Sequence, residues 1–149
     1  MTSNPQDAVA MFKEGYNCAQ AVFAACSAPY GVPRETAVRV AQAFGGGMGR
    51  TGNVCGAVTG ALMLIGFHRA ALDPKDAPAK LDAHRLAQSF LAAFAARHHS
   101  LLCRDLLGCD LGTPEGLKQA QEKNLHATVC AGLVESAAGL IEQVLAAKE

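Results

Sequence analysis

Four of the six cysteines lie shortly after a residue that commonly caps the start of a helix. They are Cys18, Cys55, Cys103 and Cys130, and the corresponding caps are Asn17, Asn53, Ser100 and Thr128. Unpaired backbone N–H groups and the helix dipole favour negative charge in a first turn, so they lower the pKa of a thiol there. Since the thiolate is both the nucleophile and the metal ligand, these four cysteines are the predicted catalytic or metal-binding residues.

The other two cysteines are assigned to different roles. Cys26 comes eight residues after Cys18, which is roughly 12 Å along a helix and too far for a disulfide. We expect Cys26 in the core, and Cys109 as an exposed thiol or an auxiliary partner of Cys103. The chain has no CxxC pair and no CxxCH, so thioredoxin-like exchange, zinc-ribbon spacing and covalent haem are not supported. Any thiol site must therefore be assembled from separate helices.

A glycine-dense stretch precedes and includes Cys55. Residues 44–60 read FGGGMGRTGNVCGAVTG and hold seven of the 15 glycines. Residues 47–52 match GxGxxG, but they follow a predicted helix rather than a strand, and the Gly-Lys-Ser/Thr of a phosphate loop is absent. Nucleotide binding is thus the weaker interpretation of this stretch.

Two other roles suit these glycines better. Glycine lets the backbone approach a cofactor or a neighbouring helix closely, and the predicted cofactor-binding residues are Gly46, Gly47, Gly49 and Gly56. Gly56 and Gly60, with the alanines that follow them, also form a small-residue face for tight helix packing. This packing role is expected whether or not the loop binds a ligand.

Three further side chains could assist the thiols. His126 lies four residues before Cys130 and could reach the same site, although a histidine in a surface turn is more common. Arg50 and Arg104 are close in sequence to Cys55 and Cys103 and could stabilise thiolates.

Apolar spacing and breaker residues predict an all-α fold. Helices are expected over about residues 4–14, 17–29, 33–44, 54–71, 79–97, 100–108, 113–124 and from 128 onward. Gly15 is expected to separate the first two, although one continuous helix is the alternative. No segment alternates with period two, and no repeat occurs. We expect residues 1–149 to form a single-domain compact bundle of about five to seven helices around a glycine-rich central loop.

Composition narrows the partners and the compartment. Hydrophobic residues make up 50% of the chain, charged residues 17%, and the formal net charge is +0. A thinly charged surface on a small domain predicts a homodimer, and scattered basic residues give no nucleic-acid footprint. We see no signal peptide, and the longest uncharged apolar run, at 54–67, is too short to cross a bilayer. The expectation is a cytoplasmic protein without membrane insertion, where thiols stay reduced unless catalytic, redox-sensing or metal-bound.

The motifs resemble one family. GYNCAQAV at 15–22, FGGGMGRTGNVCGAVTGAL at 44–62, CRDLLG at 103–108 and the late Cys130 are similar to the C_GCAxxG_C_C family of redox-active proteins. The resemblance covers about residues 8–145. It maps the four signature cysteines onto Cys18, Cys55, Cys103 and Cys130 and leaves out the other two. It implies a redox role for the four.

The leading hypothesis is one redox centre built from the four thiols, as dithiol/disulfide pairs or as ligands of an iron–sulfur cluster for electron transfer. The redox partner protein is not specified by the sequence. One alternative is a structural zinc–thiolate site, with zinc less favoured than an iron–sulfur cluster. Another is a helical module that binds a small molecule through the 45–52 glycine loop. Four cysteines allow three pairings, so the sequence leaves the connectivity open.

Overall fold

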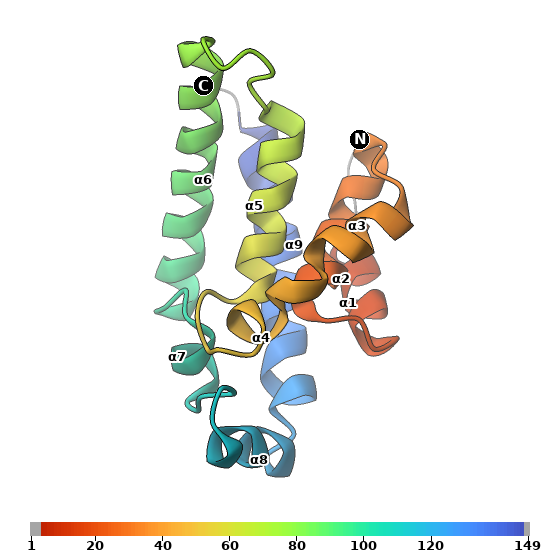
Figure 1. Cartoon of the computed structure of the whole chain (residues 1–149), viewed down its shortest axis with the longest axis vertical. Coiled ribbons are helices and arrows are strands. Elements are labelled where there is room, and N and C mark those ends of the chain that lie inside the picture. The colour runs from red at the N-terminus through yellow and green to blue at the C-terminus, as the bar shows by residue number, and fades with distance from the viewer. Residues whose placement is uncertain (1–3, 148–149) are drawn as a thin grey trace.

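The structure, a computed structural model, describes residues 4–147 and confirms the all-α class (Figure 1). Those residues contain no β-strand, only an isolated antiparallel bridge between Val54 and Leu102. The α-helices are α1 (Pro5–Lys13), α2 (Cys18–Ser27), α3 (Arg34–Ala41), α4 (Gly45–Met48), α5 (Gly56–Arg69), α6 (Ala77–His98), α7 (Cys103–Leu107), α8 (Pro114–Glu122) and α9 (Ala131–Ala146). Short 3₁₀ turns at Ala28–Tyr30 and Gln42–Phe44 and a π-helical segment at His126–Cys130 complete the helical structure.

The N-terminal helix boundaries follow from capping residues. The Asn4 side chain accepts a hydrogen bond from the Gln6 N–H at 2.9 Å, and Pro5 occupies the first position of α1. Gly15 then adopts a left-handed φ of 110°, which ends the helix as expected. Two separate helices, α1 and α2, are therefore confirmed.

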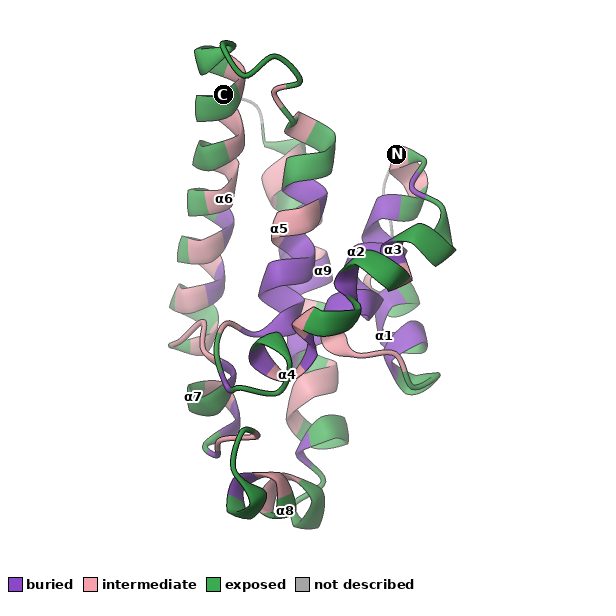
Figure 2. Cartoon of the chain, in the orientation of Figure 1, coloured by how far each residue is buried: buried purple, intermediate pink, exposed green. Residues whose placement is uncertain are grey.

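Helix α2 is the centre of the core. Every residue from Ala19 to Ser27 is buried, and α2 packs against α1, α3 and α5. Gly60 of α5 allows the closest approach, because a Cβ there would lie 2.7 Å from the Ala19 carbonyl oxygen. The small-residue face predicted on α5 is thus confirmed as a packing surface. Figure 2 shows the buried residues concentrated where α2, α5 and α9 meet.

The longest helix, α6, packs on α5 and α9 through its C-terminal half. Phe90 and Phe94 are fully buried there, with ring centroids 6.1 Å apart. Where α5 ends and α6 begins, the side chains of Phe67, Leu72 and Leu81 are exposed. These apolar side chains are the kind of surface from which the homodimer was expected, and the dimer stays a prediction.

The helical run His126–Ala146 is the one stretch within residues 4–147 whose length and composition would suit a bilayer span. It has 21 residues and a mean hydropathy of 1.5. Val134, Ala137 and Ile141 in this run are fully buried against other helices. A core helix of a soluble protein has the same composition, so the run by itself does not indicate a membrane span.

Candidate thiol site

Cys18 is the first residue of α2 and lies in a cradle of hydrogen-bond donors. A capping box precedes it: Gln20 N–H donates to the Asn17 side chain at 2.9 Å, and Asn17 N–H donates to the Gln20 side chain at 3.0 Å. The Cys55 thiol and the backbone N–H groups of Gly46 and Ala19 face the Cys18 sulfur and favour its charged form.

These donors make Cys18 the most acidic thiol of the site. The hydrogen bond from Cys55 is the largest cause, and with the backbone donors it outweighs burial, lowering the pKa of Cys18 to about 6. Cys18 is therefore the thiol of this site that most readily forms a thiolate. Its placement at a helix N-terminus was predicted, and the leading stabilisation from a second thiol was not.

Cys55 is the N-cap residue of α5 and the thiol partner of Cys18. Its backbone N–H donates to the Leu101 carbonyl at 2.8 Å, and its side chain is 5% exposed. The hydrogen bond to Cys18 holds the pKa of Cys55 well above its usual range, and burial and the Cys18 charge raise it further. One sulfur carries the charge and the other the proton.

The glycine loop sets the path of the chain between these two cysteines. Gly46 and Gly47 adopt left-handed φ values of 67° and 73° within α4, a conformation that favours glycine. Gly46 N–H points at the Cys18 sulfur. The Gly47 carbonyl accepts from Asn53 N–H at 2.9 Å and from the Thr51 hydroxyl at 2.9 Å. The glycine-rich stretch is therefore a tight loop that also supplies a donor to the Cys18 sulfur.

Cys103 reaches the site through a backbone bridge. Its N–H donates to the Asn53 carbonyl at 2.7 Å, which places the start of α7 beside the segment that leads to Cys55. Burial is the main cause that raises the pKa of Cys103 to about 11, and the Cys18 charge adds to it. The prediction that its helix start would lower the pKa of Cys103 is wrong, because a five-residue helix offsets little of the burial.

Cys130 lies at the end of the π-helical segment His126–Cys130, not in a first turn. Thr128 does not cap this helix, since its hydroxyl donates to the Asn124 carbonyl at 3.0 Å. The helical run begins after Asn124, which has a φ of 52°. Burial first, then the Cys18 charge, raises the pKa of Cys130 to about 12. The predicted first-turn placement and lowered pKa of Cys130 are both wrong.

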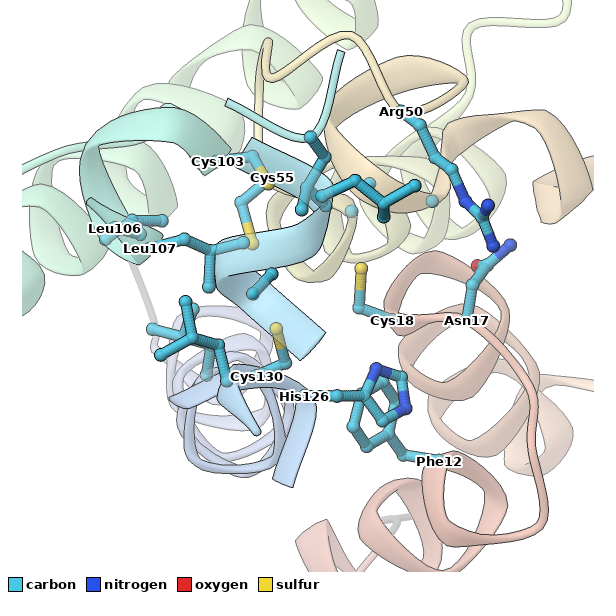
Figure 3. A pocket seen from close by; sticks show the side chains of 18 of the residues that line it. Phe12, Asn17, Cys18, Arg50, Cys55, Cys103, Leu106, Leu107, His126 and Cys130 are labelled. Atoms are coloured by element: carbon cyan, nitrogen blue, oxygen red, sulfur yellow. The ribbon is translucent and has the colours of Figure 1, made fainter. Parts of the chain in front are cut away.

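The four cysteines line one pocket of about 820 Å³ (Figure 3). Its other walls come from the glycine loop, α7, α8 and the π-helical segment. Leucines form much of the far side: Leu106, Leu107, Leu111, Leu117, Leu125 and Leu133. The pocket therefore has an apolar leucine wall opposite Cys18, and polar side chains such as Asn17, Gln42 and Gln121 line the rest of it.

His126 also lines this pocket, as its spacing from Cys130 suggested. Its ring stacks on Phe12 with centroids 4.1 Å apart, and burial lowers the pKa of His126 below its usual value. The imidazole, exposed on its outer side, thus forms part of an aromatic wall near Cys18.

The other predicted residues divide into two groups. Gly46, Gly49, Gly56 and Arg50 line the pocket, whereas Gly47, Arg104, Cys26 and Cys109 do not. Cys26 is fully buried in the core, as expected. Cys109 is 8% exposed and packs with Cys103 and Leu107, so an exposed Cys109 thiol is wrong. The leucine wall was missed, because no local pattern shows that α7 and α8 face α2.

The arrangement of donors bears on the metal hypotheses. Among residues 4–147 no group of three or more His, Cys, Asp or Glu side chains is placed to hold a metal ion, and none of the cysteines forms a disulfide. Cys18 and Cys55 are the two thiols that shift each other's pKa most strongly, and Cys103 packs with Cys109 and Cys130. All four cysteines nonetheless line the same pocket.

The comparisons agree with the cysteine pattern. Residues 16–144 match the family model described as "Putative redox-active protein (C_GCAxxG_C_C)". Because the match spans most of the chain, the protein belongs to this family of redox-active proteins. No curated protein and no solved structure matches the chain. The family resemblance noted from the motifs is confirmed.

Gly56 leaves room for the Cys18 sulfur, which predicts a specific mutant effect. A Cβ at Gly56 would meet Cys18 Sγ and lie 3.0 Å from Ala19 N and 3.2 Å from the Phe44 carbonyl. We expect Gly56→Ala to lower the free energy of unfolding by about 1–3 kcal/mol and to raise the pKa of Cys18 by moving its sulfur off the donors. Urea denaturation and the pH dependence of alkylation measure the two effects.

The matched control lies in the same helix. Gly66 is exposed in the interior of α5, and a Cβ there would meet nothing within 4 Å. Gly66→Ala should raise stability by about 0.5–1 kcal/mol and leave the pKa of Cys18 unchanged. Equal effects of the two substitutions would show that Gly56 has no special relation to the thiolate.

Proposed function

We propose that this protein is a dithiol–disulfide redox protein in which Cys18 is the nucleophile and Cys55 the second thiol. The observation that carries the proposal is the placement of Cys18 and Cys55 side by side on one pocket: Gly56, which follows Cys55, abuts the Cys18 sulfur, and each of the two thiols shifts the pKa of the other. It brings two sulfurs from separate helices together and divides them into a thiolate and a thiol. That division is what thiol–disulfide exchange requires of an attacking and a resolving cysteine.

The reaction proceeds in two exchanges. The Cys18 thiolate attacks one sulfur of a substrate disulfide, a mixed disulfide forms at Cys18, and the first substrate thiolate leaves. Cys55 then attacks Cys18 Sγ, a Cys18–Cys55 disulfide forms, and the second substrate thiolate leaves. The protein loses two electrons, and the substrate gains two electrons and two protons, one of them from Cys55. A dithiol reductant returns the pair to its starting state.

The electrostatic coupling between Cys18 and Cys55 determines the order of these two steps. The hydrogen bond to Cys18 and the charge on Cys18 are two of the three main causes that raise the pKa of Cys55. Both vanish when Cys18 enters the mixed disulfide, so the pKa of Cys55 falls at the stage at which it must become a nucleophile. Before that stage Cys55 stays protonated and stabilises the attacking thiolate.

Cys103 and Cys130 have a different part in this proposal. Their pKa values, raised to about 11 and about 12, keep both as neutral thiols at pH 7. They line the pocket as neutral side chains, so they place no second negative charge near Cys18. Neither is needed for the two-electron couple.

A redox titration tests the proposal. The folded protein is equilibrated in dithiothreitol redox buffers, and its free thiols are counted after denaturation. The count should fall from six to four in one two-electron transition. Cys18→Ser or Cys55→Ser should abolish the transition, while Cys103→Ser and Cys130→Ser should keep it. Purified protein with stoichiometric iron or zinc, and no such transition, would overturn the proposal in favour of a metal centre.

A further inference from the structure

The redox pair lies inside a pocket, which limits the size of what can react with it. Cys55 is 5% exposed, and both sulfurs line the cavity of about 820 Å³. Small-molecule sites fall in the range of about 300–1,000 Å³. A small disulfide can enter a pocket of this size whole and reach both the partly exposed Cys18 and the buried Cys55.

The far wall suits the carbon atoms beside a disulfide. The leucine wall lies beside Cys103 and Cys130 and faces Cys18 across the pocket, as Figure 3 shows for Leu106 and Leu107. Such a wall contacts methylene groups favourably and excludes water from the exchanging sulfurs. An apolar wall alone would accept many ligands, so the specificity has to come from its polar groups.

One charged side chain lines the pocket besides the thiolate. Arg50 is the only Lys, Arg, Asp or Glu among the lining residues, and it takes part in none of the ion pairs found within residues 4–147. Its Cγ lies 2.8 Å from where a Cβ of Gly46 would be, so the side chain packs over the glycine whose N–H holds Cys18. Figure 3 shows the guanidinium beside the Asn17 side chain, at the exposed rim of the pocket on the Cys18 side.

We infer that the substrate of the Cys18–Cys55 pair is a low-molecular-weight disulfide that carries a carboxylate. The inference rests on the proposed function and adds the class of substrate to it. The guanidinium of Arg50 binds the carboxylate, the leucine wall contacts the carbon chain, and the disulfide lies against Cys18. No lining residue is an Asp or Glu, so nothing in the pocket repels the anion except Cys18 itself, which the exchange neutralises.

The bonds and electrons balance as in the exchange above. The S–S bond of the disulfide RSSR breaks, the Cys18–Cys55 bond forms, and two molecules of RSH leave. The second proton comes from water, since Cys18 enters the reaction already deprotonated. The reductant that restores the pair is a dithiol.

Two disulfides of equal chain length and different end groups test the inference. They are 3,3′-dithiodipropionate, with carboxylate ends, and bis(2-hydroxyethyl) disulfide, with neutral ends. Oxidation of the reduced protein is followed by stopped-flow mixing and free-thiol counting for wild type, Arg50→Gln and Arg104→Gln. Arg104 is exposed and outside the pocket, so its substitution removes the same charge without touching the site.

We expect the ratio of the carboxylate rate to the neutral rate to fall about fivefold or more in Arg50→Gln and to stay at the wild-type value in Arg104→Gln. An unchanged ratio in Arg50→Gln, or faster oxidation by the disulfides of insulin than by either small disulfide, would overturn the inference and leave the dithiol function standing. If no disulfide oxidises Cys18 and Cys55, the proposed function itself fails.

Discussion

Replacing Cys18 with serine removes the thiol that iodoacetamide alkylates first at pH 7, about 30- to 100-fold faster than it alkylates Cys103. With a pKa of about 6 for Cys18 against about 11 for Cys103, the thiolate fractions differ by about 10⁴. The lower basicity of Cys18 reduces its intrinsic nucleophilicity, which cancels roughly half of that exponent. The net ratio can be read from the initial rate of label incorporation.

The pH dependence of the alkylation rate tests the direction in which the pKa of Cys18 is shifted. A lowered pKa means that the alkylation rate of the wild type rises through a midpoint of about 6 and is level above it. Cys55→Ala removes the largest cause of the shift, so its midpoint moves to higher pH and its rate at pH 7 falls. A wild-type midpoint near the ordinary thiol value, or one that Cys55→Ala leaves in place, would contradict the hydrogen-bonded pair.

Replacing Gly47 with alanine should give the largest loss of stability of any single substitution in the loop. Its φ of 73° is unfavourable for a side chain, and the new Cβ would lie 2.6 Å from Asn53 N and 2.7 Å from both the Asn53 carbonyl oxygen and Cys103 Cβ. These backbone atoms join the loop to the start of α7, so they cannot move alone. We expect the free energy of unfolding to fall by about 2–4 kcal/mol in urea denaturation.

Gly49 provides the control for this substitution. It has a similar φ of 65°, but a Cβ there would have only the Ala43 carbonyl oxygen nearby, at 3.8 Å. Gly49→Ala should therefore cost about 1–2 kcal/mol from backbone conformation alone. If the two variants lost the same stability, the close contact of Gly47 with Asn53 would have no energetic weight.

The parts of the fold that depend on neighbouring residues could be predicted from the sequence. Asn4 and Asn17 cap their helices and Gly15 separates them, because capping is decided within a few residues. Thr128 also has a side-chain hydroxyl that could cap a helix, but it does not act as a cap here. Its hydroxyl bonds to the Asn124 carbonyl, and the left-handed Asn124 starts the helical run earlier.

The acidity of the thiols could not be predicted in the same way. A helix start suggested lowered pKa values for all four cysteines, yet only Cys18 has one, since its main stabiliser is a thiol 37 positions away in sequence, at Cys55. Burial decides the direction for Cys103 and Cys130. Both effects depend on which helices meet, and the cysteine motif shows only that the residues belong to one site.

Peptide mapping after mild oxidation tests the central claim most directly. The reduced protein is treated with a limited amount of diamide, blocked with iodoacetamide in denaturant, digested and analysed by mass spectrometry. The account predicts one linked peptide pair that joins Cys18 to Cys55, with the other cysteines carrying the alkyl label. A disulfide between Cys103 and Cys130, with Cys18 and Cys55 both alkylated, would contradict it.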